Sequence, residues 1–116
     1  MKIATTLSDI REYELSEEET VDIFADAGFK YLDYSFYDVL NIENHPFMSP
    51  DWKDTIQKTK KAADARGVKF IQAHAPAGKI LGDGAGKNLV ATERSIRACG
   101  MLGIKNMVIH SGFFDE

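Results

Sequence analysis

Two histidines of this 116-residue chain stand at the end of short apolar runs that are typical of buried β-strands. His74 follows residues 68–73, and His110 ends the run 106–110. Imidazole can bind a metal ion or exchange a proton near neutral pH. Neighbouring parallel strands would bring both rings to one edge of a sheet, where they could share a substrate or a metal ion. The alternative is that each ring only hydrogen-bonds nearby backbone.

A carboxylate, Asp33, lies inside another predicted strand. Asp33 lies within residues 31–36, where a buried charge is unusual unless it is paired or faces a polar cavity. It either orients substrate hydroxyls or a neighbouring histidine, or it pairs with a helix Lys or Arg. His74, His110 and Asp33 are the candidate substrate-binding residues, and the two histidines are also the candidate metal ligands. The sequence assigns no catalytic residue.

Two other features, His45 and the Gly-rich segment 78–88, do not match known metal-binding or phosphate-binding patterns. His45 lies in a loop and lacks the spacing of a metal-ligand pair, so we interpret it as a solvated or loop-packing residue. The Gly-rich segment 78–88 leads into a helix but misses the phosphate-binding patterns, because Leu81, Lys87 and Asn88 occupy key positions. We interpret it as a flexible loop, with phosphate contact as the alternative.

The candidate residues need a scaffold, and the first half of the chain supplies two strands and a helix. Residues 2–6 and 31–36 are predicted strands, and the first is followed by a predicted polar loop. Between them, Ser16 and Glu19 form a capping box that predicts a helix start, and Gly28 ends the helix. Its apolar positions, at helical spacing, are Val21, Phe24 and Ala27.

The second half repeats this order. Ser49 as N-cap and Pro50 at the first helical position predict a helix that runs to about residue 66. The strand 68–73 follows. Asn88 is the expected cap of a third helix, which ends at Leu102 and Gly103 before the strand 106–110. Its predicted buried face carries Leu89, Ile96 and Cys99.

Strands separated by helices predict parallel pairing through right-handed crossovers. We therefore expect an α/β fold, a parallel (βα) repeat of four strands and three helices that forms one (βα)4-like domain over residues 1–116. Ligands of such folds bind at the carboxyl ends of the strands. An open four-stranded sheet leaves two unpaired edges, which fits half of a TIM-type (β/α)8 barrel. A doubly wound, flavodoxin-like sheet is the alternative.

Composition restricts the class of protein further. The net charge of −4 and the lack of a basic face disfavour nucleic acid as a partner. Cys99 is the single cysteine, which fits a reducing compartment. No run approaches the ~18 apolar residues that a membrane span needs. We expect a soluble, cytoplasmic protein with no membrane partner.

Three short motifs, in this order, resemble the xylose isomerase-like sugar-phosphate isomerase/epimerase superfamily. They are AGFKYLD at 27–33, QAHAP at 72–76 and MVIHSG at 107–112. The first resembles the second-strand motif of the family, where Glu usually occupies the place of Asp33. The motifs around His74 and His110 also resemble the endonuclease IV branch, whose matching histidines bind zinc.

The resemblance covers nearly the whole chain but only the first four units of an eight-unit barrel, so the segment is interpreted as truncated. It implies a parent enzyme that isomerises or epimerises a ketose or aldose, free or as its phosphate. It also implies a divalent metal (Mn, Co, Mg or Zn) bound by residues of later strands and used in proton transfer. We therefore expect this segment to be inactive alone and completed by a second copy or a C-terminal half-barrel. The alternatives are an endonuclease IV-like repair enzyme fragment and a non-catalytic half-barrel that binds a small molecule.

Overall fold

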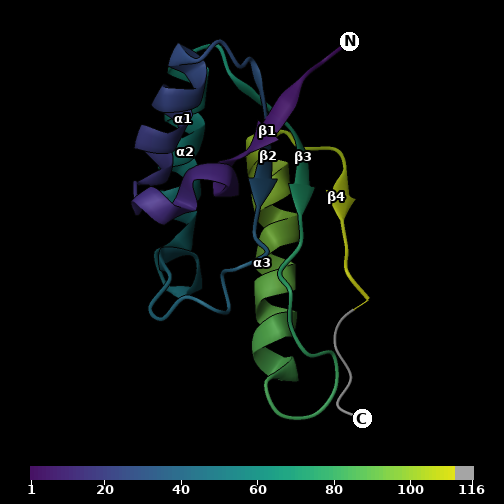
Figure 1. Ribbon diagram of the computed structural model, residues 1–116. Coiled ribbons are helices and arrows are strands. Elements are labelled where there is room, and N and C mark those ends of the chain that lie inside the picture. Colours follow the sequence, from purple (N-terminus) through teal and green to yellow (C-terminus); the bar gives the residue numbers. More distant parts are fainter. Residues whose placement is uncertain (112–116) are drawn as a thin grey trace.

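The computed structural model describes residues 1–111, whose strands form one parallel sheet with helices against one face (Figure 1). The strands are β1 (Ala4–Thr6), β2 (Tyr31–Ser35), β3 (Lys69–His74) and β4 (Met107–Val108). Their order in the sheet is β1-β2-β3-β4, each parallel to the next. This order confirms the predicted parallel (βα) repeat of a partial TIM-type barrel and differs from the reversed order of a flavodoxin-like sheet.

The helices that connect the strands are α1 (Glu17–Asp26), α2 (Trp52–Ala65) and α3 (Ala85–Leu102). Two 3₁₀ helices, η1 (Leu7–Tyr13) and η2 (Pro46–Met48), occupy segments that the sequence suggested were loops. The predicted capping box is confirmed: the Ser16 hydroxyl accepts the N–H of Glu19 at 3.2 Å, and the Glu19 carboxylate accepts the N–H of Ser16 at 2.9 Å. Within residues 1–111, no helix has the length and apolar character to cross a membrane.

The predicted start of the second helix was wrong. Ser49 does not cap α2; its hydroxyl donates to the carbonyl of Pro46 at 2.7 Å and so closes η2. Local hydrogen bonds of this kind compete with helix capping. The helix begins only at Trp52, after a turn.

The cap and the buried face predicted for the third helix were also wrong. Asn88 lies inside the first turn of α3, buried, and its amide donates to the carbonyl of Lys79 at 3.0 Å. Leu89 and Ile96 are 71% and 55% exposed, although Cys99 is buried. The face that packs against the sheet carries mostly small side chains at helical spacing, namely Ala91, Ser95, Ala98 and Leu102.

The core lies between the sheet and the helices. Leu32 and Tyr34 of β2 are buried there, and Tyr34 packs on Phe36 and Phe70 with ring centroids 4.5 and 5.5 Å away. Successive side chains of a strand point to opposite faces. Asp33, between these two core residues, therefore points to the open face of the sheet.

An irregularity in β3 brings its polar side chains to the same open face. Leu32 pairs with Phe70 but Asp33 pairs with Gln72, so Ile71 is an extra residue that has no partner in the register. Phe70 and Ala73, three positions apart, are both buried in the core. The bulge thus reverses the alternation and turns the side chains of Gln72 and His74 away from the helices.

Candidate functional site

The carboxylate of Asp33 joins two neighbours from β3 on the open face. One oxygen of Asp33 accepts the side-chain amide of Gln72 at 2.9 Å, and the carboxylate lies 3.0 Å from Nδ1 of His74. The Asp33 residue is only 7% exposed, whereas the side chain of His74 is 34% exposed. Asp33 therefore pairs with a strand histidine rather than with a helix Lys or Arg.

The ring of His110 lies beside that of His74. Their centroids are 6.0 Å apart and the planes differ by 19°, so the rings are nearly parallel. Tyr37 packs its edge on His110 at 5.1 Å. The structure thus brings together the three residues, Asp33, His74 and His110, that the sequence singled out.

The Asp33 contact determines which nitrogen of His74 faces a ligand. An ionised carboxylate only accepts hydrogen bonds, so Nδ1 of His74 carries the hydrogen that points to Asp33. Nε2 is then the nitrogen left to bind a metal or exchange a proton. A carboxylate that holds an imidazole in one tautomer in this way is a recurring device in acid–base sites.

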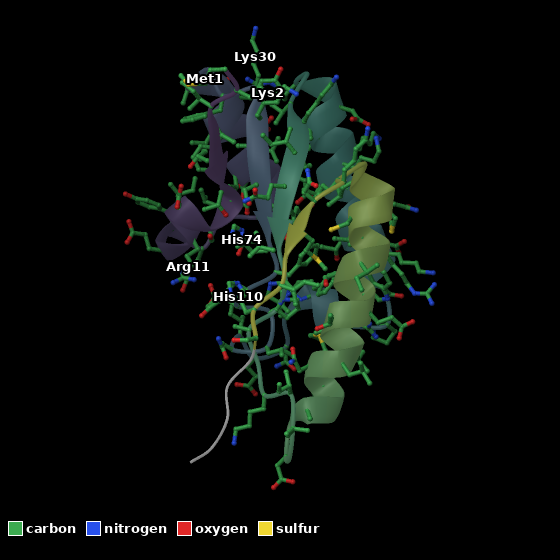
Figure 2. All side chains as sticks on the ribbon, turned by 90° about the vertical axis from the view of Figure 1, so that its right-hand side faces the viewer. Met1, Lys2, Arg11, Lys30, His74 and His110 are labelled. Atoms are coloured by element: carbon green, nitrogen blue, oxygen red, sulfur yellow. The ribbon has the colours of Figure 1, made fainter. Side chains whose placement is uncertain are left out.

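A hollow of about 310 Å³ surrounds these rings at the carboxyl ends of the strands. Besides His74 and His110, it is lined by Arg11 of η1 and Asp38, which form an ion pair, and by Tyr37, Thr6, Ser8 and Ser35. Figure 2 shows Arg11, His74 and His110 near one another at about mid-height of the molecule. The hollow combines an arginine–carboxylate pair, two imidazoles and several hydroxyl-bearing residues, which suits a polar ligand.

The described residues do not by themselves fit a divalent metal. Within residues 1–111, no group of three or more His, Cys, Asp or Glu side chains has the geometry to hold a metal ion. The carboxylate of Asp33 is already hydrogen-bonded to the amide of Gln72 and to Nδ1 of His74. The predicted role of His74 and His110 as metal ligands thus stays a prediction that needs ligands from outside these residues.

His45 does not line the strand-end hollow, although it borders a neighbouring hollow together with Arg11 and Asp38. Its Nδ1 accepts the N–H of Phe47 at 3.1 Å and so caps η2. Burial lowers the pKa of His45, which favours the neutral ring that this hydrogen bond requires. His45 therefore has a structural role in the loop.

Sequence reasoning missed Gln72 and Arg11. Gln72 was hidden because the bulge at Ile71 changes the face on which its side chain lies. Arg11 lies in a segment interpreted as a loop, and its approach to the strand ends depends on the 3₁₀ helix and on Asp38. The third motif of the sequence ends at Gly112, which lies outside the described residues.

Comparison with known proteins supports the architecture. No protein-family model matches the chain, and no curated protein matches it. Four solved chains match in structure, among them a xylose isomerase domain protein from Alicyclobacillus acidocaldarius subsp. acidocaldarius. That match has a TM-score of 0.57 and 16% sequence identity, and it covers 92% of this chain but 35% of the other. The chain therefore has the fold of part of a TIM-type barrel, similar to a segment of that xylose isomerase domain protein.

Proposed function

We propose that this segment supplies one side of the active site of a sugar isomerase or epimerase, which acts on a ketose or aldose by proton transfer. The observation that carries the proposal is the Asp33–His74 pair beside His110 at the carboxyl ends of the strands. This is where barrel enzymes place their catalytic groups. The structural likeness to a xylose isomerase domain supports the fold on which the proposal rests.

We assign to His74 the role of the general base that removes the sugar C–H proton. With Nδ1 donating to Asp33, Nε2 can take a proton from the carbon next to a sugar carbonyl and leave an enediolate. An isomer forms when this proton goes to the former carbonyl carbon and the hydroxyl proton moves to the other oxygen. An epimer forms when a second proton donor, from outside residues 1–111, protonates the original carbon on the opposite face. His110 and the hydroxyl groups of the hollow would hold the sugar hydroxyls during this exchange.

Arg11 favours a sugar phosphate over a free sugar. Its guanidinium lines the same hollow as His74 and His110, and its side chain is 63% exposed. Guanidinium groups bind phosphate through two parallel hydrogen bonds. A phosphate would then compete with Asp38, the present partner of Arg11.

The remainder of the site would come from outside residues 1–111. Within these residues, β1 and β4 each have one strand neighbour, so each sheet edge offers unpaired backbone groups. We propose that a C-terminal half-barrel or a second copy covers this face and contributes the carboxylates that a divalent metal needs. Such a metal would polarise the sugar carbonyl. The buried free thiol of Cys99 agrees with a cytoplasmic location.

Titration of fructose 6-phosphate into the labelled chain, followed by the ring resonances of its histidines, tests the substrate proposal. We expect His74 and His110 to shift, and the phosphorylated sugar to bind more tightly than fructose. Arg11→Ala should abolish that preference. Arg97→Ala, which removes an exposed arginine paired with Glu93 on α3, is the matched control. Absence of any ring shift with either sugar would contradict the proposal.

The reaction type is tested in the complete barrel by exchange of the sugar C–H hydrogen in deuterated water. Loss of a general base typically costs on the order of 10²–10⁴ in rate, so His74→Gln should slow exchange by that factor. Sugar binding without exchange would favour the non-catalytic binding protein. Cleavage of abasic DNA with added zinc, lost in the same variant, would favour the nuclease.

A further inference from the structure

The three turns that lead from a helix into the next strand share one sequence pattern, Gly, an apolar residue, then Lys. The pattern occurs at Gly28-Phe29-Lys30, at Gly67-Val68-Lys69 and at Gly103-Ile104-Lys105. Each glycine has a positive φ, between 66° and 93°. Three repeats at structurally equivalent places indicate that the position of the lysine is set by the fold.

The backbone of the three turns is also the same. The N–H of each apolar residue donates to the carbonyl five residues earlier, at 2.9 Å in all three turns. This is the Schellman closure of a helix, in which a left-handed glycine turns the chain and the next apolar residue packs inward. Val68 and Ile104 are buried as this motif requires. The residue that follows must then emerge at the start of the strand.

The result is one lysine at the start of each strand. Lys2 precedes β1, Lys30 precedes β2, Lys69 begins β3 and Lys105 precedes β4. All four are exposed, and within the described chain none of them forms an ion pair. Figure 2 shows Lys2 and Lys30 at the end of the molecule opposite His110. Lys69 is level with Tyr31 in the register, so the side chain of Lys30, one position earlier, points to the opposite face. The other three lysines, Lys2, Lys69 and Lys105, form a short cationic row on strands ~4.8 Å apart.

A hollow of about 610 Å³ opens along this row on the sheet. Lys2, Lys69 and Lys105 line it together with the side chains of Tyr31, Gln72 and Asn106, and no carboxylate does. The Lys2 ammonium lies 5.1 Å from the centroid of the Tyr31 ring. In a chain with a net charge of −4, three lysines around a hollow free of acidic groups are a local reversal of charge.

We infer that this hollow binds a compact anion with two or more phosphate groups. Ammonium groups bind phosphate as point charges, and Asn106, which also lines the hollow, carries a side-chain amide donor. The volume falls in the range of small-molecule sites. The hollow shares no lining residue with the strand-end hollow. Both lie on the sheet face that a completing half-barrel would cover, so the inference concerns the chain with this face open.

Calorimetric titration with inorganic tripolyphosphate, pyrophosphate and phosphate tests the inference. We expect tripolyphosphate to bind most tightly, and Lys69→Ala/Lys105→Ala to weaken it about tenfold or more. Lys69→Arg/Lys105→Arg, which keeps the charges, should retain binding. Lys58→Ala/Lys61→Ala removes two exposed lysines of α2 and the same net charge, and it should leave the affinity unchanged.

Lysines near helix ends also stabilise the helix dipole, so thermal unfolding is measured with and without tripolyphosphate. We expect the ligand to raise the melting temperature of the wild type and of Lys58→Ala/Lys61→Ala, but not that of a folded Lys69→Ala/Lys105→Ala variant. Equal weakening in the two alanine double variants would overturn the inference. Tighter binding of a single-stranded oligonucleotide than of tripolyphosphate would replace the compact anion with nucleic acid.

Discussion

The hydroxyl of Tyr34 lies 2.6 Å from each carboxylate oxygen of Glu17, and this contact joins β2 to the first turn of α1. Thr59 of α2 donates to the same carboxylate, so three elements meet at one acidic group on the helix side of the sheet. Burial raises the pKa of Glu17, and the hydrogen bonds from Thr59 and Tyr34 oppose that rise only in part. Burial, followed by the charge of Glu17, also raises the pKa of Tyr34.

The raised pKa of Glu17 makes stability depend on pH. Because the folded chain holds this proton more tightly than the unfolded chain, its contribution is complete below the ordinary value of 4.5 and is lost as pH rises through the folded pKa. Glu17→Gln cannot ionise. Urea unfolding should therefore favour this variant over wild type more at about pH 7 than at about pH 4. Glu43→Gln, in an exposed loop, is the control; a pH-independent difference for Glu17→Gln would contradict the expectation.

The Asp33–His74 contact predicts the tautomer of His74. Asp33→Ala removes the acceptor for Nδ1–H, so the preference for that tautomer should disappear in ¹⁵N spectra of the imidazole. Gln72→Ala leaves the contact intact and should leave the spectrum of His74 unchanged. If both variants kept the wild-type tautomer, Asp33 would not be the group that orients the ring.

Ile56 anchors α2 against the sheet and is fully buried. Ile56→Ala should lower the free energy of unfolding by ~2–5 kcal/mol, and Ile56→Val by ~0.5–1.5 kcal/mol, because the larger truncation leaves a larger cavity. Ile23→Ala, at a position 44% exposed on α1, should cost less than Ile56→Ala. Denaturant unfolding measures all three, and an equal cost for Ile56→Ala and Ile23→Ala would refute this view of the core.

Cys99 should be nearly unreactive in the folded chain. Burial raises its pKa to about 11, so little thiolate is present at neutral pH. Reaction with a disulfide reagent at about pH 8 should be slower than in urea-unfolded chain by about two orders of magnitude, from thiolate content alone. Similar rates in both states would show that α3 opens readily or that the thiol is accessible.

Local sequence signals predicted the order of strands and helices but not every boundary. The capping box at Ser16 and the glycine at position 28 act over a few residues, and the structure confirms the helix between them. The signal at Ser49 was equally local but ambiguous, because the same hydroxyl can close η2 or cap α2. Only the packing of Phe47 and Trp52, whose rings lie 5.5 Å apart in the core, decides between these uses.

For the candidate site and the helix α3, too, some features could be predicted from the sequence and others could not. Strand-end position was enough to group His74 with His110, because parallel strands carry their carboxyl ends to one edge. The buried face of α3 was not predictable from large apolar residues, since Leu89 and Ile96 are exposed and Ala91 and Ala98 are not. Small residues give a weak hydrophobic signal, although they fit where a helix lies close to a sheet.

The extra residue in β3 makes the site a matter of counting as well as of chemistry. If β3 alternated regularly through Ile71, His74 would lie four positions after Phe70 and on the side where Phe70 is packed. Because Ile71 is an extra residue without a partner, His74 lies on the open face instead. A related chain with the same spacing but no bulge would present that imidazole to its core, whereas a chain with one residue fewer would reach the open face with a regular strand.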